Sequence, residues 1–289
     1  MSRLWTKEIE IEFFTNALKN FSEPEQLFYI ADNGKFYAYW PKSYKGKKTT
    51  LQSRNALIGN FTEKFTVELL QDFAFKHNFY AVQGGICKEI GLSSRSPADV
   101  VLAKRKKKEL QAEEIVAIFE VKMSVVWNWE FKNGQLIYVG DYRTHQGNPG
   151  LLRSDSMLKA IGKSINIRVS GPKTSKIPII ILGNTPISES YFRKVDHLKQ
   201  AGIIQGFWSV NPEPLDNNGQ NLKFTPKKGF IRFDSVQEFY KELEKLLFRE
   251  MLFFSSMKSR NELGRIIEIA NFENTYELKA EKFLELIRE

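Results

Sequence analysis

Two apolar runs of strand length stand out in the pattern of hydrophobic and polar positions, at residues 96–103 and 117–122. Polar or turn residues bound each run, and an acidic residue interrupts each of them, at Asp99 and at Glu120. Because side chains alternate between the two faces of a strand, Glu120 and Lys122 should point the same way, with their apolar neighbours turned towards a core. If the two strands pair as a hairpin or meander, Asp99 lies beside Glu120. The pattern therefore predicts two carboxylates and one ammonium gathered in a small space.

The rest of the chain alternates between helical periodicity and further strand-length runs. The spacing of apolar residues predicts helices at 1–20, 60–79, 154–169, 188–201 and 234–253, followed by helical segments to residue 289. Shorter runs predict strands at 80–83, 177–183, 203–210 and 230–233. The run at 177–183 is apolar throughout, which is typical of a parallel strand buried on both faces. Alternating helices and strands predict an α/β sheet that is covered on both sides.

Two aromatic segments, 28–40 and 127–139, predict hairpins outside this sheet, each turning at an Asn-Gly pair that supplies the positive φ of a tight turn. The first hairpin is a candidate platform for base stacking, but we favour the commoner role of a small sheet with one packed face. After it, residues 41–59 contain lysines and an arginine but no acidic residue. This composition predicts a basic loop, which either orders against phosphate or remains a solvated linker.

Composition limits the classes of protein to consider. The net charge of +9 and the pI near 9.3 favour an anionic partner. The single cysteine, Cys87, excludes an intrachain disulfide and a cysteine-rich zinc site, and fits a reducing cytoplasm. The N-terminus has no apolar signal core and the chain has no apolar run of bilayer length, so we expect no membrane partner. Serine–histidine catalysis lacks a supporting motif such as GxSxG, and we expect no nucleotide cofactor.

A bound cation would explain the pair of carboxylates. Charge in a half-buried strand is costly unless something uses it, and a divalent cation would relieve the repulsion between Asp99 and Glu120. Hard cations such as Mg²⁺ take oxygen ligands, keep several waters, and can stabilise charge on a phosphate oxygen. Lys122 would then orient or activate a water, or stabilise the negative charge that develops at phosphorus. The alternative is a strand that merely carries a surface ion pair between Glu120 and Lys122.

Residues 97–99 (Pro-Ala-Asp), followed by residues 120–122 (Glu-Val-Lys), resemble the motif of the PD-(D/E)xK nuclease superfamily. The sequence departs from that motif at Ala98, which separates the proline from the aspartate by one residue. A second acidic-x-lysine triplet at 277–279 lies in a charged helical segment with no aspartate-bearing strand before it. The resemblance implies the fold class α/β, with a three-layer α/β/α restriction-endonuclease-like core and a mixed central sheet.

The same resemblance implies roles for individual residues. Asp99 and Glu120 would bind Mg²⁺ together with the carbonyl of Val121, and Mn²⁺ would substitute for Mg²⁺. Lys122 would act on the attacking water. The reaction implied is Mg²⁺-dependent hydrolysis of phosphodiester bonds.

Members of this superfamily often place a further glutamate on the helix before the aspartate strand. Glu63 and Glu68 both qualify by position. Glu63 follows Asn60 by three residues, and the commoner explanation for that spacing is a capping box at a helix start. Glu68 falls on the same side of the predicted helix as Phe61 and Phe65, so we expect it to be partly buried.

The length, the basic loops and the aromatic hairpin look like a type II restriction endonuclease, which is usually a homodimer acting on palindromic sites in double-stranded DNA. Residues 1–54 would be an accessory region for DNA binding or dimer contacts, 55–233 the nuclease core, and 234–289 a helical region packed on the core. The basic helix at 154–169 would cover one sheet face and lend cations to the cleft. The candidates for DNA contact are Lys45, Lys47, Lys48, Gln52, Arg54, Lys104, Arg105, Lys106, Asn128, Arg143, His145, Gln146, Arg153, Lys159 and Lys163.

Two other functions fit the same residues. One keeps the core but changes the substrate, giving a repair, junction-resolving or modification-dependent nuclease. The other is a basic DNA-binding protein without catalysis, for which the carboxylates would be structural.

Overall fold

The computed structural model describes residues 2–20, 23–213, 222–248 and 260–288, and its centre is a six-stranded mixed sheet. The strands are β3 (Tyr80–Gly85), β4 (Ala98–Ala103), β5 (Ile115–Lys122), β8 (Ile179–Gly183), β9 (Gly206–Ser209) and β10 (Phe230–Arg232). They lie in the order β10-β9-β8-β5-β4-β3. The first three in sequence pair antiparallel, whereas β5, β8, β9 and β10 run parallel. The prediction of a fully buried, parallel central strand at 177–183 is confirmed by β8.

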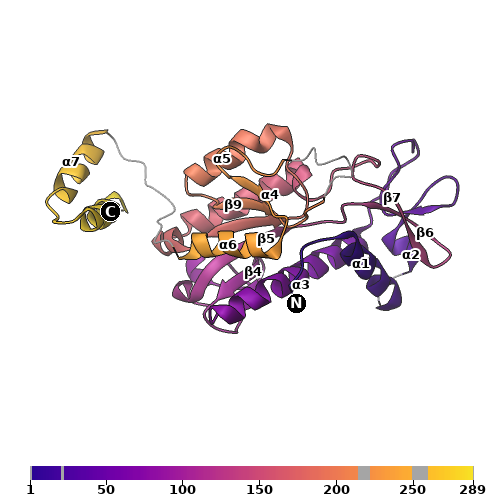
Figure 1. The fold of residues 1–289 in the computed structure, drawn as a ribbon, viewed down its shortest axis with the longest axis horizontal. Coiled ribbons are helices and arrows are strands. Elements are labelled where there is room, and N and C mark those ends of the chain that lie inside the picture. The colour runs from indigo at the N-terminus through magenta and orange to yellow at the C-terminus, as the bar shows by residue number, and fades with distance from the viewer. Residues whose placement is uncertain (1, 21–22, 214–221, 249–259, 289) are drawn as a thin grey trace.

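Helices pack on both faces of this sheet (Figure 1). Side chains of α1 (Lys7–Asn20), α3 (Gln52–Lys76) and α6 (Val236–Leu247) join the apolar cluster on the face that contains Val100 and Phe119. Side chains of α4 (Ser154–Val169) and α5 (Phe192–Gln200) join the cluster on the opposite face, with Val101 and Ile118. The alternation of adjacent strand residues between two clusters follows from the two-residue repeat of a strand. The chain is therefore a mixed α/β protein with an apolar core on each side of its main sheet.

A second, antiparallel sheet joins the two predicted hairpins, which are far apart in the sequence. It contains β1 (Tyr29–Ile30), β2 (Phe36–Tyr37), β6 (Asn128–Lys132) and β7 (Gln135–Gly140), in the order β1-β2-β6-β7. The rings of Phe28 and Phe131 stack with centroids 5.2 Å apart, and both side chains pack into the core. This arrangement fits the favoured prediction of a small sheet with one packed face, and Figure 1 shows the sheet beyond the end of β5.

The first long helix starts earlier than predicted. α3 begins at Gln52, so the basic loop ends near residue 51 and Asn60 lies inside the helix. The capping box predicted for Asn60 and Glu63 is therefore wrong. The predicted boundary between residues 54 and 55 also falls within α3.

Short helical segments complete the fold. They are α2 (Pro24–Leu27) and the 3₁₀ turns Lys88–Ile90, Ala112–Glu114, Gly150–Leu152, Pro172–Lys176 and Glu189–Tyr191. Ser235 caps α6 by accepting a hydrogen bond from the backbone N–H of Glu238 at 3.1 Å. Part of the helix predicted at 234–253 lies outside the described residues.

Two helices close the chain, α7 (Arg260–Ala270) and α8 (Tyr276–Arg288). They pack against each other, and Figure 1 shows the pair away from the main sheet. Among the helices that the structure describes, none has both the length and the apolar character needed to cross a membrane.

Candidate active site

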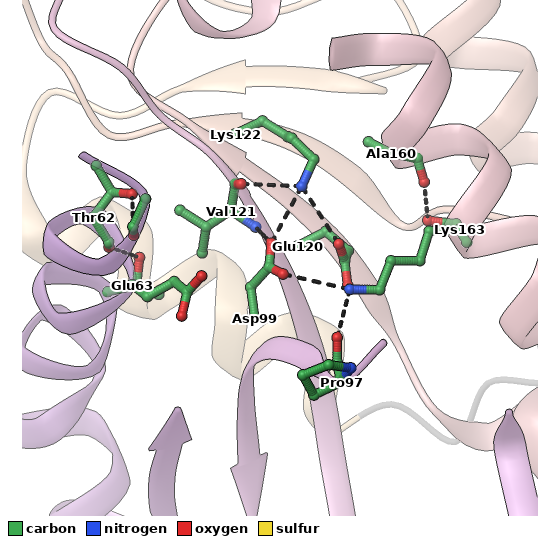
Figure 2. Close-up of polar contacts among 12 residues, drawn as sticks. Thr62, Glu63, Pro97, Asp99, Glu120, Val121, Lys122, Ala160 and Lys163 are labelled. Carbon is green, nitrogen blue, oxygen red and sulfur yellow. Dashed lines mark hydrogen bonds and ion pairs between the residues drawn. The ribbon is translucent and has the colours of Figure 1, made fainter. Parts of the chain in front are cut away.

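The pairing of β4 with β5 brings the two predicted carboxylates together. Val100 lies opposite Phe119 in this antiparallel pair, and the same register continued by one residue puts Asp99 opposite Glu120. Asp99 Oδ2 accepts a hydrogen bond from the backbone N–H of Val121 at 2.7 Å, which fixes the carboxylate against β5. Figure 2 shows Asp99 and Glu120 side by side, with Lys122 on the same strand as Glu120. The predicted convergence of two carboxylates and one ammonium is confirmed as geometry.

Two lysines, not one, bind this pair of carboxylates. Lys122 Nζ lies 3.2 Å from Asp99 Oδ2 and 3.4 Å from Glu120 Oε2, and it also donates to the Val121 carbonyl at 3.1 Å. Lys163 Nζ, from α4, lies 3.4 Å from Asp99 Oδ1 and 2.6 Å from Glu120 Oε1. Each carboxylate therefore gives one oxygen to each ammonium (Figure 2).

Burial perturbs the protonation of this cluster. The Glu120 side chain is fully buried, and burial, helped by the negative charge of Asp99, raises the pKa of its carboxyl to about 7, even though Lys122 and Lys163 oppose the shift. Burial alone would lower the pKa of Lys122, but Asp99 and Glu120 outweigh it and leave that pKa above its ordinary value. Lys122 is therefore a cation near neutral pH and is better suited to stabilise negative charge than to accept a proton.

A third carboxylate stands beside the pair. Glu63, on α3, is half-buried, and burial raises its pKa, with a further contribution from the charge of Asp99. Its Oε2 accepts a hydrogen bond from Gln83 Nε2, on β3, at 2.8 Å. Of the two candidate helix glutamates, Glu63 is thus the one at the site. Glu68 is exposed, so the expectation that it is partly buried is wrong.

Neither Gln83 nor the backbone carbonyl of Pro97, which accepts a hydrogen bond from Lys163 Nζ at 2.6 Å, was predicted to belong to the site. Lys163 was predicted as a candidate DNA contact on the basic helix that lends cations to the cleft, but its direct pairing with Asp99 and Glu120 was not predicted. Yet the sequence does contain a signal, because Lys163 lies in helical register with Met157 and Ala160, which are buried on the sheet-facing side of α4. A lysine on the apolar stripe of a helix needs a partner, and here the partners are two carboxylates.

Several predicted DNA contacts are instead structural. Arg54 is buried on α3, where its guanidinium donates to the carbonyls of Leu27 and Ala38. Gln52 lies exposed in the first turn of the same helix. The prediction that Arg54 contacts DNA from a basic loop is therefore wrong, because its side chain is buried and its guanidinium donates to backbone carbonyls inside the protein.

Three more predicted DNA contacts are structural, namely Asn128 at the start of β6 and His145 and Gln146 after β7. Asn128 is buried, and its Oδ1 accepts a hydrogen bond from the backbone N–H of Tyr39 at 2.9 Å. His145 is buried and stacks on the ring of Tyr39 with centroids 3.9 Å apart. Gln146 donates through Nε2 to the carbonyl of Pro41 at 3.0 Å and to that of Tyr44 at 2.6 Å. These side chains fasten the start of the basic loop to the second sheet, so they are not available to read bases.

The lysines and arginines at the tip of the β4–β5 hairpin lie far from the carboxylates. β4 runs from Asp99 at the site to the tip, which begins at Lys104, so roughly 17 Å of strand separates the two. Lys104, Arg105 and Lys106 are exposed, and Arg105 Nε also lies 3.1 Å from Glu114 Oε1. DNA held at the carboxylates would therefore not be bound mainly by this tip.

The remaining candidates lie at the surface. Lys45, Lys47 and Lys48 are exposed in the basic loop. Arg143 Nε lies 3.1 Å from Asp141 Oδ2, and Arg153, just before α4, lies 2.8 Å from Asp155 Oδ2. Lys159, one turn before Lys163 on α4, is exposed, with Nζ 3.9 Å from Asp155 Oδ2. Arg153 and Lys159 could contact phosphate by giving up only exposed, weak ion pairs with Asp155. Arg143 would have to leave Asp141, which is buried. The candidates that stay at the surface are Lys45, Lys47, Lys48, Arg143, Arg153 and Lys159.

The donor set suits a hard cation. Within the described residues, no group of three or more histidine, cysteine, aspartate or glutamate side chains is arranged around a metal position. Asp99 and Glu120 nevertheless supply two carboxylates, and the carbonyls of Val121 and Pro97 face the same two ammonium groups. Mg²⁺ is commonly held by one or two carboxylates, with water and substrate oxygens filling the remaining positions, so these residues fit it.

Comparison of the chain with protein-family models, with curated proteins and with solved structures found no match. The functional argument therefore rests on the residues and their geometry.

Proposed function

We propose that this protein is a Mg²⁺-dependent endonuclease of the PD-(D/E)xK type that hydrolyses double-stranded DNA. The observation that carries the proposal is the convergence of Asp99, Glu120 and Lys122 at the ends of two paired strands, with Glu63 beside them. The net charge of +9 supports a polyanionic substrate.

The residues have distinct parts in this reaction. Asp99 and Glu120, with the Val121 carbonyl, would hold the cation, which when bound supplies positive charge at the phosphate and makes a bound water more acidic. Lys122 keeps its proton beside the two carboxylates and stabilises the negative charge that develops on the phosphate. Hydrolysis then needs no covalent enzyme intermediate.

Substitutions at the site test this proposal. Asp99→Ala and Lys122→Ala should abolish Mg²⁺-dependent cleavage of plasmid DNA while leaving DNA binding in a gel-shift assay. Lys241→Ala, which removes an exposed lysine from α6, is the matched control and should cleave like the wild type. If either purified site variant still cuts plasmid DNA with Mg²⁺, the assignment of Asp99 and Lys122 as catalytic residues is wrong.

Within this class, we infer a type II restriction endonuclease acting as a homodimer, because two-fold symmetry in the protein would match a palindromic site. Digestion of unmodified plasmid should then give discrete bands. A smear, or cutting only of branched, damaged or methylated DNA, would instead favour a repair, junction-resolving or modification-dependent nuclease on the same core.

One observation favours a function without catalysis. Two lysines pair with the two carboxylates, so the cluster is electrically balanced and could be a structural ion-pair network. In that case the protein would bind DNA with a steep dependence on salt and would not nick it at any concentration of Mg²⁺.

A further inference from the structure

Lys163 differs from Lys159, the other lysine of α4, in what it contacts. Its Nζ touches three oxygens, the carbonyl of Pro97 at 2.6 Å, Glu120 Oε1 at 2.6 Å and Asp99 Oδ1 at 3.4 Å. Lys159, one turn earlier, is exposed and lies near only an exposed carboxylate. Figure 2 shows the Lys163 side chain extended from α4 to the carboxylates.

The three oxygens around Lys163 mirror those around Lys122. Each ammonium contacts one oxygen of Asp99, one oxygen of Glu120 and one backbone carbonyl, which is that of Val121 for Lys122 and that of Pro97 for Lys163. The carboxylate pair thus has two flanks, and each flank is a cradle of three oxygens that suits a cation.

The two cradles hold their ammonium groups unequally. The contacts of Lys122 are 3.1, 3.2 and 3.4 Å, whereas two of the three contacts of Lys163 are 2.6 Å. Lys163 also comes from a separate helix, α4, whereas Lys122 lies on β5, the same strand as Glu120. A divalent cation would therefore displace Lys122 more readily than Lys163.

Removing the Lys163 charge would leave two carboxylates, Asp99 and Glu120, with a single ammonium, that of Lys122. Because Glu120 is fully buried, this excess of negative charge would be costly. The cradle of Pro97, Asp99 and Glu120 would then lack its ammonium, and its three oxygens are hard ligands of the kind that a second divalent cation takes.

We propose that Lys163 is a built-in second cation, which fills the cradle of Pro97, Asp99 and Glu120 so that the site takes a single divalent ion, on the Lys122 side. The purpose of this arrangement rests on the proposed nuclease function, whereas the experiment that tests it does not require DNA cleavage. Lys163 is a positioning residue in this account: it fixes the number of divalent ions and the orientation of the carboxylates.

Counting bound Mn²⁺ without DNA tests the inference. Titration of the full chain with Mn²⁺, followed by the electron paramagnetic resonance signal of the free ion, should give one bound ion for the wild type and two for Lys163→Met. Lys163→Arg keeps the charge and should return the count to one, and Lys159→Met is the matched control, also with one. Circular dichroism confirms that each variant is folded, and Lys163→Gln serves in place of Lys163→Met if that variant is unfolded.

Two bound ions in the wild type, none in the wild type, or one in both folded neutral variants would overturn the inference. Its failure differs from failure of the proposed function. If the number of bound Mn²⁺ ions rises from one in the wild type to two in Lys163→Met, but the wild type cuts no DNA, the role of Lys163 is supported and the nuclease function is refuted. If the wild type cuts DNA but Lys163→Met still binds one Mn²⁺ ion, the nuclease function is supported and the proposed role of Lys163 is refuted.

Discussion

Glu10 offers the most quantitative test of how the site is supported. Its carboxylate is fully buried on α1 and accepts four hydrogen bonds. The donors on Oε1 are Trp5 Nε1 at 3.0 Å and the backbone N–H of Val126 at 2.5 Å. The donors on Oε2 are the backbone N–H of Trp127 at 3.3 Å and Trp129 Nε1 at 2.9 Å. Glu10 thereby ties the N-terminal helix to the segment that connects β5, which ends in the site, with β6.

Glu10→Gln keeps the shape of this side chain but replaces one acceptor oxygen with an NH₂ group. Two of the four donors would then face another donor inside the core. Because each buried unsatisfied donor costs about 1–3 kcal/mol, the variant should lose about 2–6 kcal/mol of the free energy of unfolding. That loss is a large part of the total of about 5–15 kcal/mol that is typical of a domain.

The same residue should make stability depend on pH. Burial raises the pKa of Glu10 to about 7 in the folded protein, against the four hydrogen bonds, which lower it. The folded state therefore binds a proton more tightly than the unfolded state. The stabilisation that results is complete below pH 4.5 and is lost as the pH rises through about 7, by roughly 3 kcal/mol in all. Glu10→Gln cannot titrate and should lack this part of the slope.

Urea unfolding at several pH values, followed by tryptophan fluorescence, measures both effects. Glu12→Gln is the matched control, because Glu12 lies on the same helix but forms a surface ion pair with Arg3 and should cost at most about 1 kcal/mol. A Glu10→Gln variant that loses no more stability than Glu12→Gln, or that keeps the wild-type dependence on pH, would refute the reasoning.

Three further predictions follow from the structure. Burial raises the pKa of Glu120 to about 7, so the ionised form that would hold a cation is lost as the pH falls. The value of kcat/KM for DNA cleavage should therefore drop about tenfold per pH unit below pH 7. A flat pH profile down to pH 5 would contradict this prediction. Arg54→Met leaves two backbone carbonyls without their buried donor and should lower the urea midpoint by an amount equivalent to about 3 kcal/mol, whereas Gln52→Ala, on the same helix but exposed, should leave it unchanged. Gly150 has a φ of +52°, and a Cβ there would lie 3.1 Å from the carbonyl oxygen of Lys122. Gly150→Ala should therefore slow cleavage more than it weakens DNA binding. Equal effects on cleavage and on binding would argue against a role of Gly150 in placing Lys122.

Much of the main sheet could be predicted because its signals are local. The apolar alternation of β4 and β5, with turn residues between them, sets the register that places Asp99 beside Glu120. The start of α3 at Gln52 could not be predicted from hydrophobic periodicity, for a physical reason. The buried stripe of its first turns includes Arg54 and Thr62 as well as Ile58, so polar residues occupy positions at which a search for hydrophobic periodicity expects apolar ones.

The rest of the site depends on contacts between distant segments. Lys163 reaches Asp99 and Glu120 from α4, and Gln83 reaches Glu63 from β3. No local pattern in the sequence states which strand or helix either side chain will face. The amides of Asn128 and Gln146 illustrate the converse, because the same side chains that read bases also satisfy backbone groups inside a protein. Only the fold decides between the two uses.

The most direct test of the catalytic centre is single-turnover cleavage of supercoiled plasmid by the purified wild type and by Glu120→Gln, each with Mg²⁺ and with excess chelator. The account predicts that the wild type converts the plasmid to nicked or linear DNA only with Mg²⁺, and that Glu120→Gln binds the plasmid but leaves it intact. Cleavage by Glu120→Gln at the wild-type rate, or no cleavage of any DNA by the wild type with Mg²⁺ or Mn²⁺, would contradict it.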